Sequence, residues 1–208
     1  MSTPGALSEA WFERIDPSPD PLFYAAPRLV NHIDDATIAA LSDYYRGVLP
    51  PGGALLDLMS SWVSHLPADV PFARVAGLGM NEEELAANPR LTERCVHDLN
   101  TRPALPYDSE SFDAVLCAVS VQYLVRPIEV FAEVRRVLRR GGASIVAMSH
   151  RCFPTKAVRA FHVLPRDGRF DLVATYHALA GGFAEPERLD RSPAGADPLW
   201  IVAARRHG

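Results

Sequence analysis

The segment at 105–142 constrains the fold more than any other part of this 208-residue chain. Its apolar run at 114–121 carries almost no charge, which is typical of a strand buried between two layers of helices. Apolar residues then recur at helical spacing from Ile128 to Leu138 with charged residues on the other face, and Gly141 and Gly142 predict the end of that helix. A turn, a buried strand, a loop and an amphipathic helix in this order predict an α/β domain with a parallel sheet.

The rest of the chain alternates in the same way. Asp34 or Asp35 is a candidate cap for a helix that reaches Val48, where Pro50 and the residues after it break it. The pattern predicts strands at 54–58, 74–78, 95–97, 114–118 and 143–148 with helices between them, a polar and aromatic insertion at 149–165, a helix at about 170–180, and closing strands near 187–190 and 199–204.

The first 32 residues differ in composition from the rest. They are rich in proline and acidic residues, and they include the aromatic residues Trp11, Phe12, Phe23 and Tyr24. This composition predicts an arm or lid at 1–32 that docks through its aromatic side chains, not an independent domain. Residues 33–208 are then a single domain, and a hydrophobic content of 48% is sufficient for a full core.

Composition also bears on partners and location. The formal net charge of -4 argues against a general nucleic-acid-binding surface. The three cysteines are scattered and lack CxxC spacing, which argues against a disulfide framework or a metal site and suits a reducing compartment. No apolar stretch approaches the ~20 residues that a membrane span needs. We therefore expect a cytoplasmic protein that acts neither on nucleic acid nor in a membrane.

The stretch LPYDSESFDAVLCAVSVQYL, with the helix that ends LRRGG, closely resembles class I S-adenosylmethionine-dependent methyltransferases of the methyltransferase type 11-like group. The family's stretch reads roughly LPF, a short spacer, SFD-x-V, a histidine-rich loop and a helix ending LKPGG. The resemblance covers nearly everything from about Ile33 onward. It implies a doubly wound, mostly parallel seven-stranded sheet with an antiparallel C-terminal edge hairpin. It also implies S-adenosylmethionine as the cofactor, bound at the carboxyl ends of the first four strands.

The first of these strand ends reads LLDLMSSWVSHLP. The family usually has D/E-x-G-x-G-x-G here, because glycines let the backbone approach the cofactor closely. Asp57 matches the acid, but Met59, Ser61 and Val63 replace the glycines. Two interpretations stay open: a turn at Ser60 and Ser61 still holds the cofactor, or the loop is filled and the pocket altered. The spacing of Trp62, Val63 and Leu66 also predicts a helix capped by one of these serines.

The second strand end reads VAGLGMNEEEL. Relatives commonly have an acid here for both ribose hydroxyls, whereas this chain has Gly79 at that place. Met80 is suited to packing on the adenine ring. Asn81 is either a ribose contact or, as we favour, the N-cap of the next helix, with Glu84 completing a capping-box-like pattern. Together with DL-x-SSWVSH, this motif indicates a distinct subgroup with a degenerate glycine-rich loop.

The third and fourth strand ends follow the family more closely. In CVHDLN, the resemblance assigns the Asp98 carboxylate to the adenine amino group and the Leu99 backbone N–H to the ring, although Asp98 is also suited to capping a turn. In CAVSVQYL, it places a backbone carbonyl near Ala118 at the cofactor's ammonium group. Gln122 or Tyr123 would then lie near the ribose or the reacting methyl group, in place of the family's histidines.

A general base is needed only where the acceptor must lose a proton. His150 is the candidate base because its position faces the substrate in relatives, but it is equally suited to be a solvated loop residue. Arg151, Lys156 and Arg159 would either attract an acidic acceptor or solvate an exposed helix face. The nearby Phe153 and Phe161 are expected to face the core.

The resemblance favours an enzyme that transfers a methyl group to a small-molecule acceptor. The alternative is a catalytically silent protein that keeps the fold for binding or as a scaffold. Loss of the loop glycines and of the ribose acid supports this alternative, whereas the retained Asp57, Asp98 and aromatic arm oppose it. A nicotinamide-dependent dehydrogenase is disfavoured because the chain lacks a GxGxxG loop.

Overall fold

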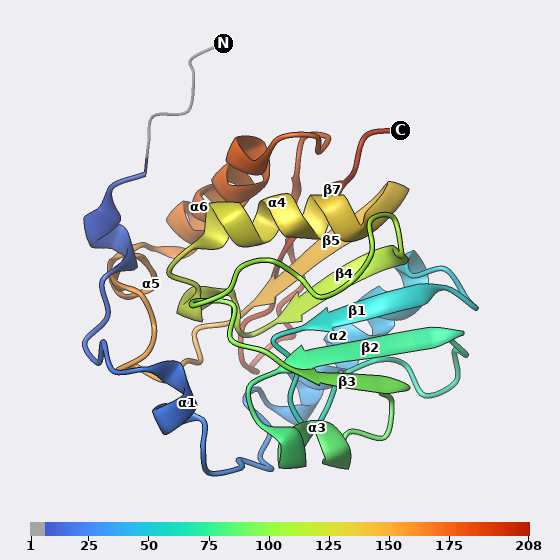
Figure 1. Ribbon diagram of the computed structural model, residues 1–208, viewed down its shortest axis with the longest axis horizontal. Helices are drawn as coiled ribbons and strands as arrows, with labels where there is room; N and C mark the ends of the chain where they lie inside the picture. The colour runs from blue at the N-terminus through green and yellow to red at the C-terminus, as the bar shows by residue number, and fades with distance from the viewer. Residues whose placement is uncertain (1–6) are drawn as a thin grey trace.

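A seven-stranded sheet forms the centre of the molecule in the computed structural model, which describes residues 7–208. The strand order is β3-β2-β1-β4-β5-β7-β6, and β7 runs antiparallel to both of its neighbours, β5 and β6, while the other pairs are parallel (Figure 1). The strands are β1 Ala54–Leu58, β2 Arg74–Gly79, β3 Glu93–Val96, β4 Phe112–Ala118, β5 Leu138–Met148, β6 Glu187–Asp190 and β7 Trp200–Arg205. The predicted fold class is confirmed.

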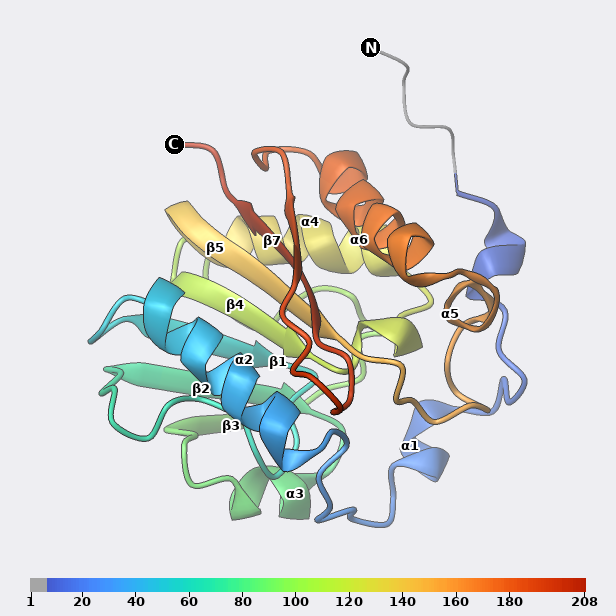
Figure 2. The ribbon, with the colours of Figure 1, turned by 180° about the vertical axis from the view of Figure 1, so that it is seen from behind.

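Helices cover both faces of the sheet, so the molecule has two hydrophobic cores (Figures 1 and 2). On one face, α4 (Pro127–Val137) and α6 (Arg166–Ala180) pack against the sheet, and on the other lie α2 (Asp35–Val48) and Leu85 of the short helix α3 (Glu82–Ala87). Successive strand residues alternate between the two cores, as Leu55 and Leu56 do. The α2 helix begins as predicted, because the Asp34 side chain accepts from the Thr37 backbone N–H.

The predicted end of the helix before the fifth strand is wrong. The α4 helix ends at Val137, and Gly141 and Gly142 lie within β5 instead of stopping the helix. The sheet determines this conformation, because Leu138 is buried opposite Phe112 at the start of β4. The strand therefore begins well before the predicted residue 143.

Two predicted helices are absent. The chain runs without helix from Met59 to the start of β2, and again between β3 and β4. After β1, the Ser60 hydroxyl donates to the Asp57 carboxylate and the Ser61 hydroxyl to the Glu84 carboxylate, so neither of the predicted serines caps a helix. Met59 and His65 have positive φ angles of 58° and 54°, which are incompatible with a right-handed helix.

The residues that precede α2 form an arm along one side of the domain, seen in blue in Figure 1. The arm contains a 3-10 turn, η1 (Glu9–Phe12), and one helical turn, α1 (Asp20–Phe23), and it contacts the segment that leads into α5 (Arg159–Val163). The division into an arm or lid at 1–32 and a domain at 33–208 stays a prediction, and residues 1–6 lie outside the described part.

Lys156, the only lysine of the chain, attaches the arm to the domain. Its side chain is fully buried, and Nζ donates to the Ser18 carbonyl at 2.7 Å. The same ammonium lies 3.1 Å from the Asp16 carboxylate and 3.4 Å from that of Asp20. Lys156 is therefore neither a solvated residue of a helix face nor a free cation for an acidic acceptor. Both expectations for this residue are wrong.

His177 makes the stability of the fold depend on pH. It is buried on α6, with its ring nitrogens 3.0 Å from the Val173 carbonyl and 3.0 Å from the Ser144 hydroxyl. Burial lowers the pKa of His177 to about 4. In the unfolded chain the pKa is about 6.5, so below that pH the unfolded state takes up the proton first. The contribution of His177 to stability is therefore complete above about pH 6.5 and is lost as the pH falls toward 4.

We expect that the wild-type protein loses about 2 kcal/mol more of its free energy of unfolding between pH 7 and 4.5 than His177→Gln does. Urea denaturation of both proteins at the two pH values measures this difference. Equal losses would show that His177 does not titrate as its burial implies.

Among the described helices, none is long and apolar enough to cross a membrane.

Candidate functional site

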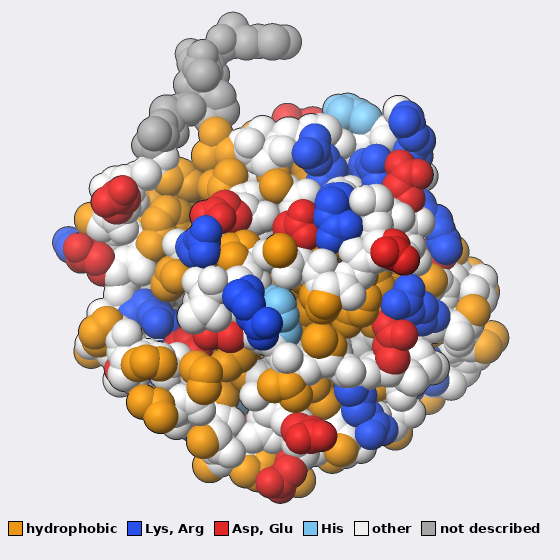
Figure 3. Space-filling model, in the orientation of Figure 1, with side chains coloured by type: hydrophobic (Ala, Val, Ile, Leu, Met, Phe, Trp, Pro, Cys, Tyr) orange, Lys and Arg blue, Asp and Glu red, His pale blue; other side chains and the backbone are white. Residues whose placement is uncertain are grey.

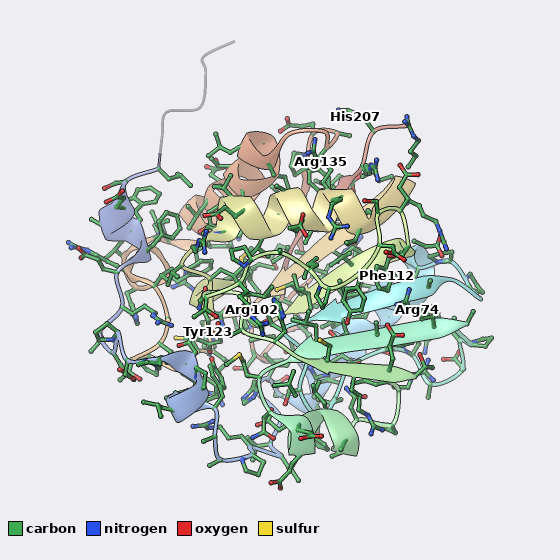
Figure 4. All side chains as sticks on the ribbon, viewed as in Figure 1. Arg74, Arg102, Phe112, Tyr123, Arg135 and His207 are labelled. Atoms are coloured by element: carbon green, nitrogen blue, oxygen red, sulfur yellow. The ribbon has the colours of Figure 1, made fainter. Side chains whose placement is uncertain are left out.

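A cavity lies where β1, β2 and β4 end, beneath the arm, and the loop that follows β3 completes its wall. In Figure 4, Tyr123 marks this end of the sheet, whereas Arg74 and Phe112 mark the opposite end. Ten of the twelve predicted cofactor-binding residues line the cavity, namely Asp57, Met59, Ser60, Ser61, Gly79, Met80, Asp98, Leu99, Ala118 and Tyr123. The structure thus brings together residues that are spread over more than sixty positions of the sequence.

Asp57 lines the cavity and is almost completely buried. The Ser60 hydroxyl donates to its carboxylate at 2.6 Å and the Ser64 hydroxyl at 2.7 Å. Burial raises the pKa of Asp57 to about 6, although both hydrogen bonds oppose the shift. The carboxylate therefore organises the loop after β1 from within.

Met59 keeps a backbone conformation that glycine usually provides. Its φ of 58° lies in the left-handed region, at the position where relatives have the first glycine of the loop. The Met59 side chain packs against the core below α4, and the Ser60 backbone N–H donates to the Leu78 carbonyl at 2.8 Å. The degenerate loop thus remains a tight turn, although it leads into no helix.

Gly79 is required because this loop approaches β2 closely. A Cβ atom at Gly79 would lie 2.2 Å from the Ser60 carbonyl oxygen, so no side chain fits at the place of the family's ribose acid. Glu84 supplies a carboxylate nearby instead: it accepts from the Ser61 hydroxyl at 2.6 Å and from the Arg28 backbone N–H at 2.7 Å, and it lines the cavity.

Asn81 caps α3, as we favoured. Its side-chain oxygen accepts from the Glu84 backbone N–H, and its amide donates to the Tyr24 and Ala25 carbonyls of the arm. The capping box is only half formed, because the Glu84 carboxylate bonds to the arm and to Ser61 instead of returning to Asn81. Asn81 does not line the cavity.

Asp98 both caps a turn and lines the cavity. Its Oδ1 accepts from the backbone N–H of Asn100 at 2.9 Å, whereas its Oδ2 has no hydrogen bond from the described residues. Asn100 in turn connects this loop to the arm, because its side-chain amide donates to Asp20 at 2.7 Å and to the Tyr123 carbonyl at 2.9 Å.

The loop after β4 contributes Ala118 and Tyr123 to the cavity. The Tyr123 ring stacks on Phe153 with 5.7 Å between centroids, and its hydroxyl accepts from the Phe153 backbone N–H. Gln122 is buried behind this wall, where its amide donates to the Val119 and Arg151 carbonyls, and it does not line the cavity. Phe153 is half-buried and lines the cavity, unlike Phe161, which is buried in the core as expected.

His150 lies outside the cavity. Its side chain is half exposed, and its Nε2 is 3.2 Å from the carboxylate of Asp197, which is also near Arg151. Three other histidines, His32, His65 and His97, line the cavity, and burial lowers the pKa of His32 and His65. Sequence reasoning missed His32, which stands in no family motif, and left His65 of the first loop without a role.

The charges that line the cavity are mostly negative. Four carboxylates, those of Asp20, Asp57, Glu84 and Asp98, line it with one arginine, Arg28, although Asp20 is already paired with Arg14 and Lys156. Such a site favours a cationic ligand where water is partly excluded. Among the described residues, no cluster of three or more histidine, cysteine or acidic side chains has the arrangement of a metal site.

The cavity lies where α/β folds of this class bind their ligands. Residues 59–146, fewer than half of the chain, match the model of the family described as methyltransferase domain. No curated protein matches the chain. The resemblance to class I S-adenosylmethionine-dependent methyltransferases is confirmed, and S-adenosylmethionine is the cofactor that it implies.

Solved structures support the same assignment of the fold. An S-adenosylmethionine-dependent methyltransferase from Mesorhizobium loti is 19% identical with a TM-score of 0.57, over 81% of this chain and 98% of that one. Phosphoethanolamine N-methyltransferase 2 from Haemonchus contortus, in complex with S-adenosylmethionine, is 14% identical with a TM-score of 0.58, over 84% of this chain and 53% of that one.

A third structure shows that the fold alone does not fix the reaction. The [4+2]-cyclase SpnF is 18% identical with a TM-score of 0.59, and the match covers 80% of each chain. Function must therefore be argued from the residues of the cavity.

Proposed function

We propose that this protein binds S-adenosylmethionine in the cavity and transfers its methyl group to a small-molecule acceptor. The observation that carries the proposal is the meeting of residues from four strand ends in one cavity, where carboxylates outnumber the one guanidinium. The cofactor's sulfonium and ammonium groups are cationic, so this lining suits them. The neutral sulfur of the product, S-adenosylhomocysteine, would lose part of that attraction, which favours product release.

The residues present fit this ligand with one change from the family. Asp98, Leu99 and Met80 would hold the adenine, and the loop at Ser60 and Ser61 with the Ala118 carbonyl would hold the methionine half. Glu84 would take the ribose hydroxyls, because the Ser60 carbonyl leaves no room for an acid at position 79. The bound cofactor would supply an already activated methyl group, so the task of the chain is to orient the acceptor and exclude water.

A small acceptor is supported by the arm. Tyr24, Arg28 and His32 of the arm line the cavity, and the Trp62 indole N–H donates to the Val30 carbonyl at 3.0 Å. The chain itself thus covers much of the site, which leaves room for a small molecule more readily than for a macromolecule.

The direct test of the reaction is transfer of a labelled methyl group from S-adenosylmethionine to a panel of small molecules that carry a hydroxyl, an amine or a carboxylic acid group. A labelled product that requires folded protein supports the proposal. Cofactor binding without transfer to any member of a broad panel would favour the catalytically silent alternative.

Asp98→Asn isolates the proposed adenine contact. Asparagine keeps an oxygen to cap the turn at Asn100, but its amide in place of the free Oδ2 would face the adenine amino group as a second donor. We expect about tenfold weaker binding of S-adenosylhomocysteine with an unchanged melting temperature, measured by calorimetry. The exposed Asp108→Asn is the control, and equal affinities of the two variants would refute the contact.

A further inference from the structure

Arg28 is the only lysine or arginine that lines the cavity. Its guanidinium lies 4.4 Å above the Phe23 ring and 5.3 Å from the Phe153 ring, measured to the centroids. It also donates to the Phe23 carbonyl at 2.9 Å and to that of Ala26 at 3.3 Å. The guanidinium is thus fixed by stacking and by backbone contacts, which is how arginine is preorganised in binding sites.

The charge of Arg28 is not paired. Four carboxylates line the same cavity, yet the guanidinium forms no ion pair with any of them or with another described residue. Glu84 contacts the Arg28 backbone N–H and not its side chain. An arginine has five N–H donors, of which the two carbonyls take two, so three remain for a ligand. A partly buried, unpaired guanidinium with free donors is a recognition group for a carboxylate.

The surroundings of Arg28 indicate the shape of that ligand. Tyr24, Tyr123 and Phe153 line the cavity beside it with aromatic faces and edges, and His32 meets the Phe153 ring edge-on at 5.2 Å. Burial lowers the pKa of His32, so at neutral pH it offers a hydrogen bond without a second charge. Exposed apolar side chains of the arm, Leu22, Leu29 and Val30, continue the apolar surface outward, where Figure 3 shows hydrophobic side chains gathered around α1.

We propose that Arg28 binds the carboxylate of a planar, aromatic acceptor whose ring packs against Tyr123 and Phe153. This inference rests on the proposed methyl transfer and names the class of its substrate. The carboxyl ends of the strands, with their four acids, would take the cationic cofactor, and the arm would take the anionic acceptor. The two ligands would then meet at the boundary between the acidic wall and Arg28.

The test uses benzoate as the probe, with the neutral benzamide as its match, on full-length protein saturated with S-adenosylhomocysteine. Calorimetry is expected to show benzoate binding at least tenfold more tightly than benzamide, because only benzoate forms a charge-assisted hydrogen bond with the guanidinium. Arg28→Gln should abolish that preference. Arg28→Lys keeps the charge but not the planar guanidinium that donates two hydrogen bonds to a carboxylate, so it should keep part of the preference. Ile15→Ala, an exposed residue of the arm that does not line the cavity, should leave it unchanged.

Cofactor affinity distinguishes failure of this inference from failure of the proposed function. If Arg28→Gln weakens S-adenosylhomocysteine but not 5′-methylthioadenosine, which lacks the carboxylate, Arg28 binds the cofactor's carboxylate and the inference is overturned. Equal binding of benzoate and benzamide to the wild-type protein overturns it as well. Absence of any S-adenosylhomocysteine binding instead removes the proposed function on which the inference rests.

Discussion

Lys156→Met is expected to lower the free energy of unfolding by about 3 kcal/mol and to release the arm from the domain. The Lys156 ammonium is fully buried between the Ser18 carbonyl and the carboxylates of Asp16 and Asp20. Removing one member of a buried ion pair costs about 3–5 kcal/mol, because the remaining charge stays desolvated and unpaired. We expect the lower end of this range, since Arg14 still pairs with Asp20 at 2.6 Å.

Urea denaturation measures the change in stability, and limited trypsin digestion at Arg14 and Arg28 reports release of the arm. Arg159→Met is the matched control: it removes another cation of the same segment, but its contact with Glu13 is exposed and 3.9 Å long. The control should change stability by less than about 0.5 kcal/mol. Equal effects of the two substitutions would contradict the clamp role of Lys156.

Gly79→Ala is expected to cost about 3 kcal/mol, an unusually large effect for one added methyl group. The new Cβ would lie 2.2 Å from the Ser60 carbonyl oxygen, and the Ser60 N–H is held by the Leu78 carbonyl, so the backbone of the loop must move. An acid at this position would meet the same obstacle. Restoring the family's ribose acid should therefore disrupt the loop instead of improving the site.

Gly47→Ala in α2 provides the control because a Cβ there would meet nothing within 4 Å. Within a helix, alanine is favoured over glycine by about 0.5–1 kcal/mol, and Gly47 lies in the last turn of α2, so this variant should be slightly more stable than the wild type. The two substitutions add the same methyl group, but the expected changes in the free energy of unfolding have opposite signs. Urea denaturation measures both changes. An unchanged stability of Gly79→Ala would mean that the loop after β1 is free to shift.

The sequence was sufficient to predict the sheet, because buried strands are marked by uncharged apolar runs and the helices between them by their period. It failed where tertiary contacts override a local signal. Gly141 and Gly142 predicted the end of a helix, but these residues lie in β5, which pairs with β4 and β7. Ser60 and Ser61 after β1 were predicted as helix caps, but Asp57 accepts from the Ser60 hydroxyl and Glu84 accepts from the Ser61 hydroxyl.

The candidate site was predictable only where family motifs mark the strand ends. The motifs placed Asp57, Asp98 and Tyr123, which do line one cavity. Arg28 stands in no such motif, and Glu84 was assigned only to a capping box, because the contact between them joins positions 56 apart in the sequence. Lys156 was misjudged for the same reason: its partners lie on the arm, about 140 residues away. Long-range partners of this kind have no periodic signature.

The central claim is that the cavity at the ends of β1 to β4 binds S-adenosylmethionine in spite of its altered loop. Isothermal titration of S-adenosylhomocysteine into purified, ligand-free protein tests this claim most directly. The account predicts one site per chain with micromolar affinity, a binding free energy of about -8 kcal/mol. A folded protein that takes up neither S-adenosylhomocysteine nor S-adenosylmethionine would contradict the claim and favour the silent alternative.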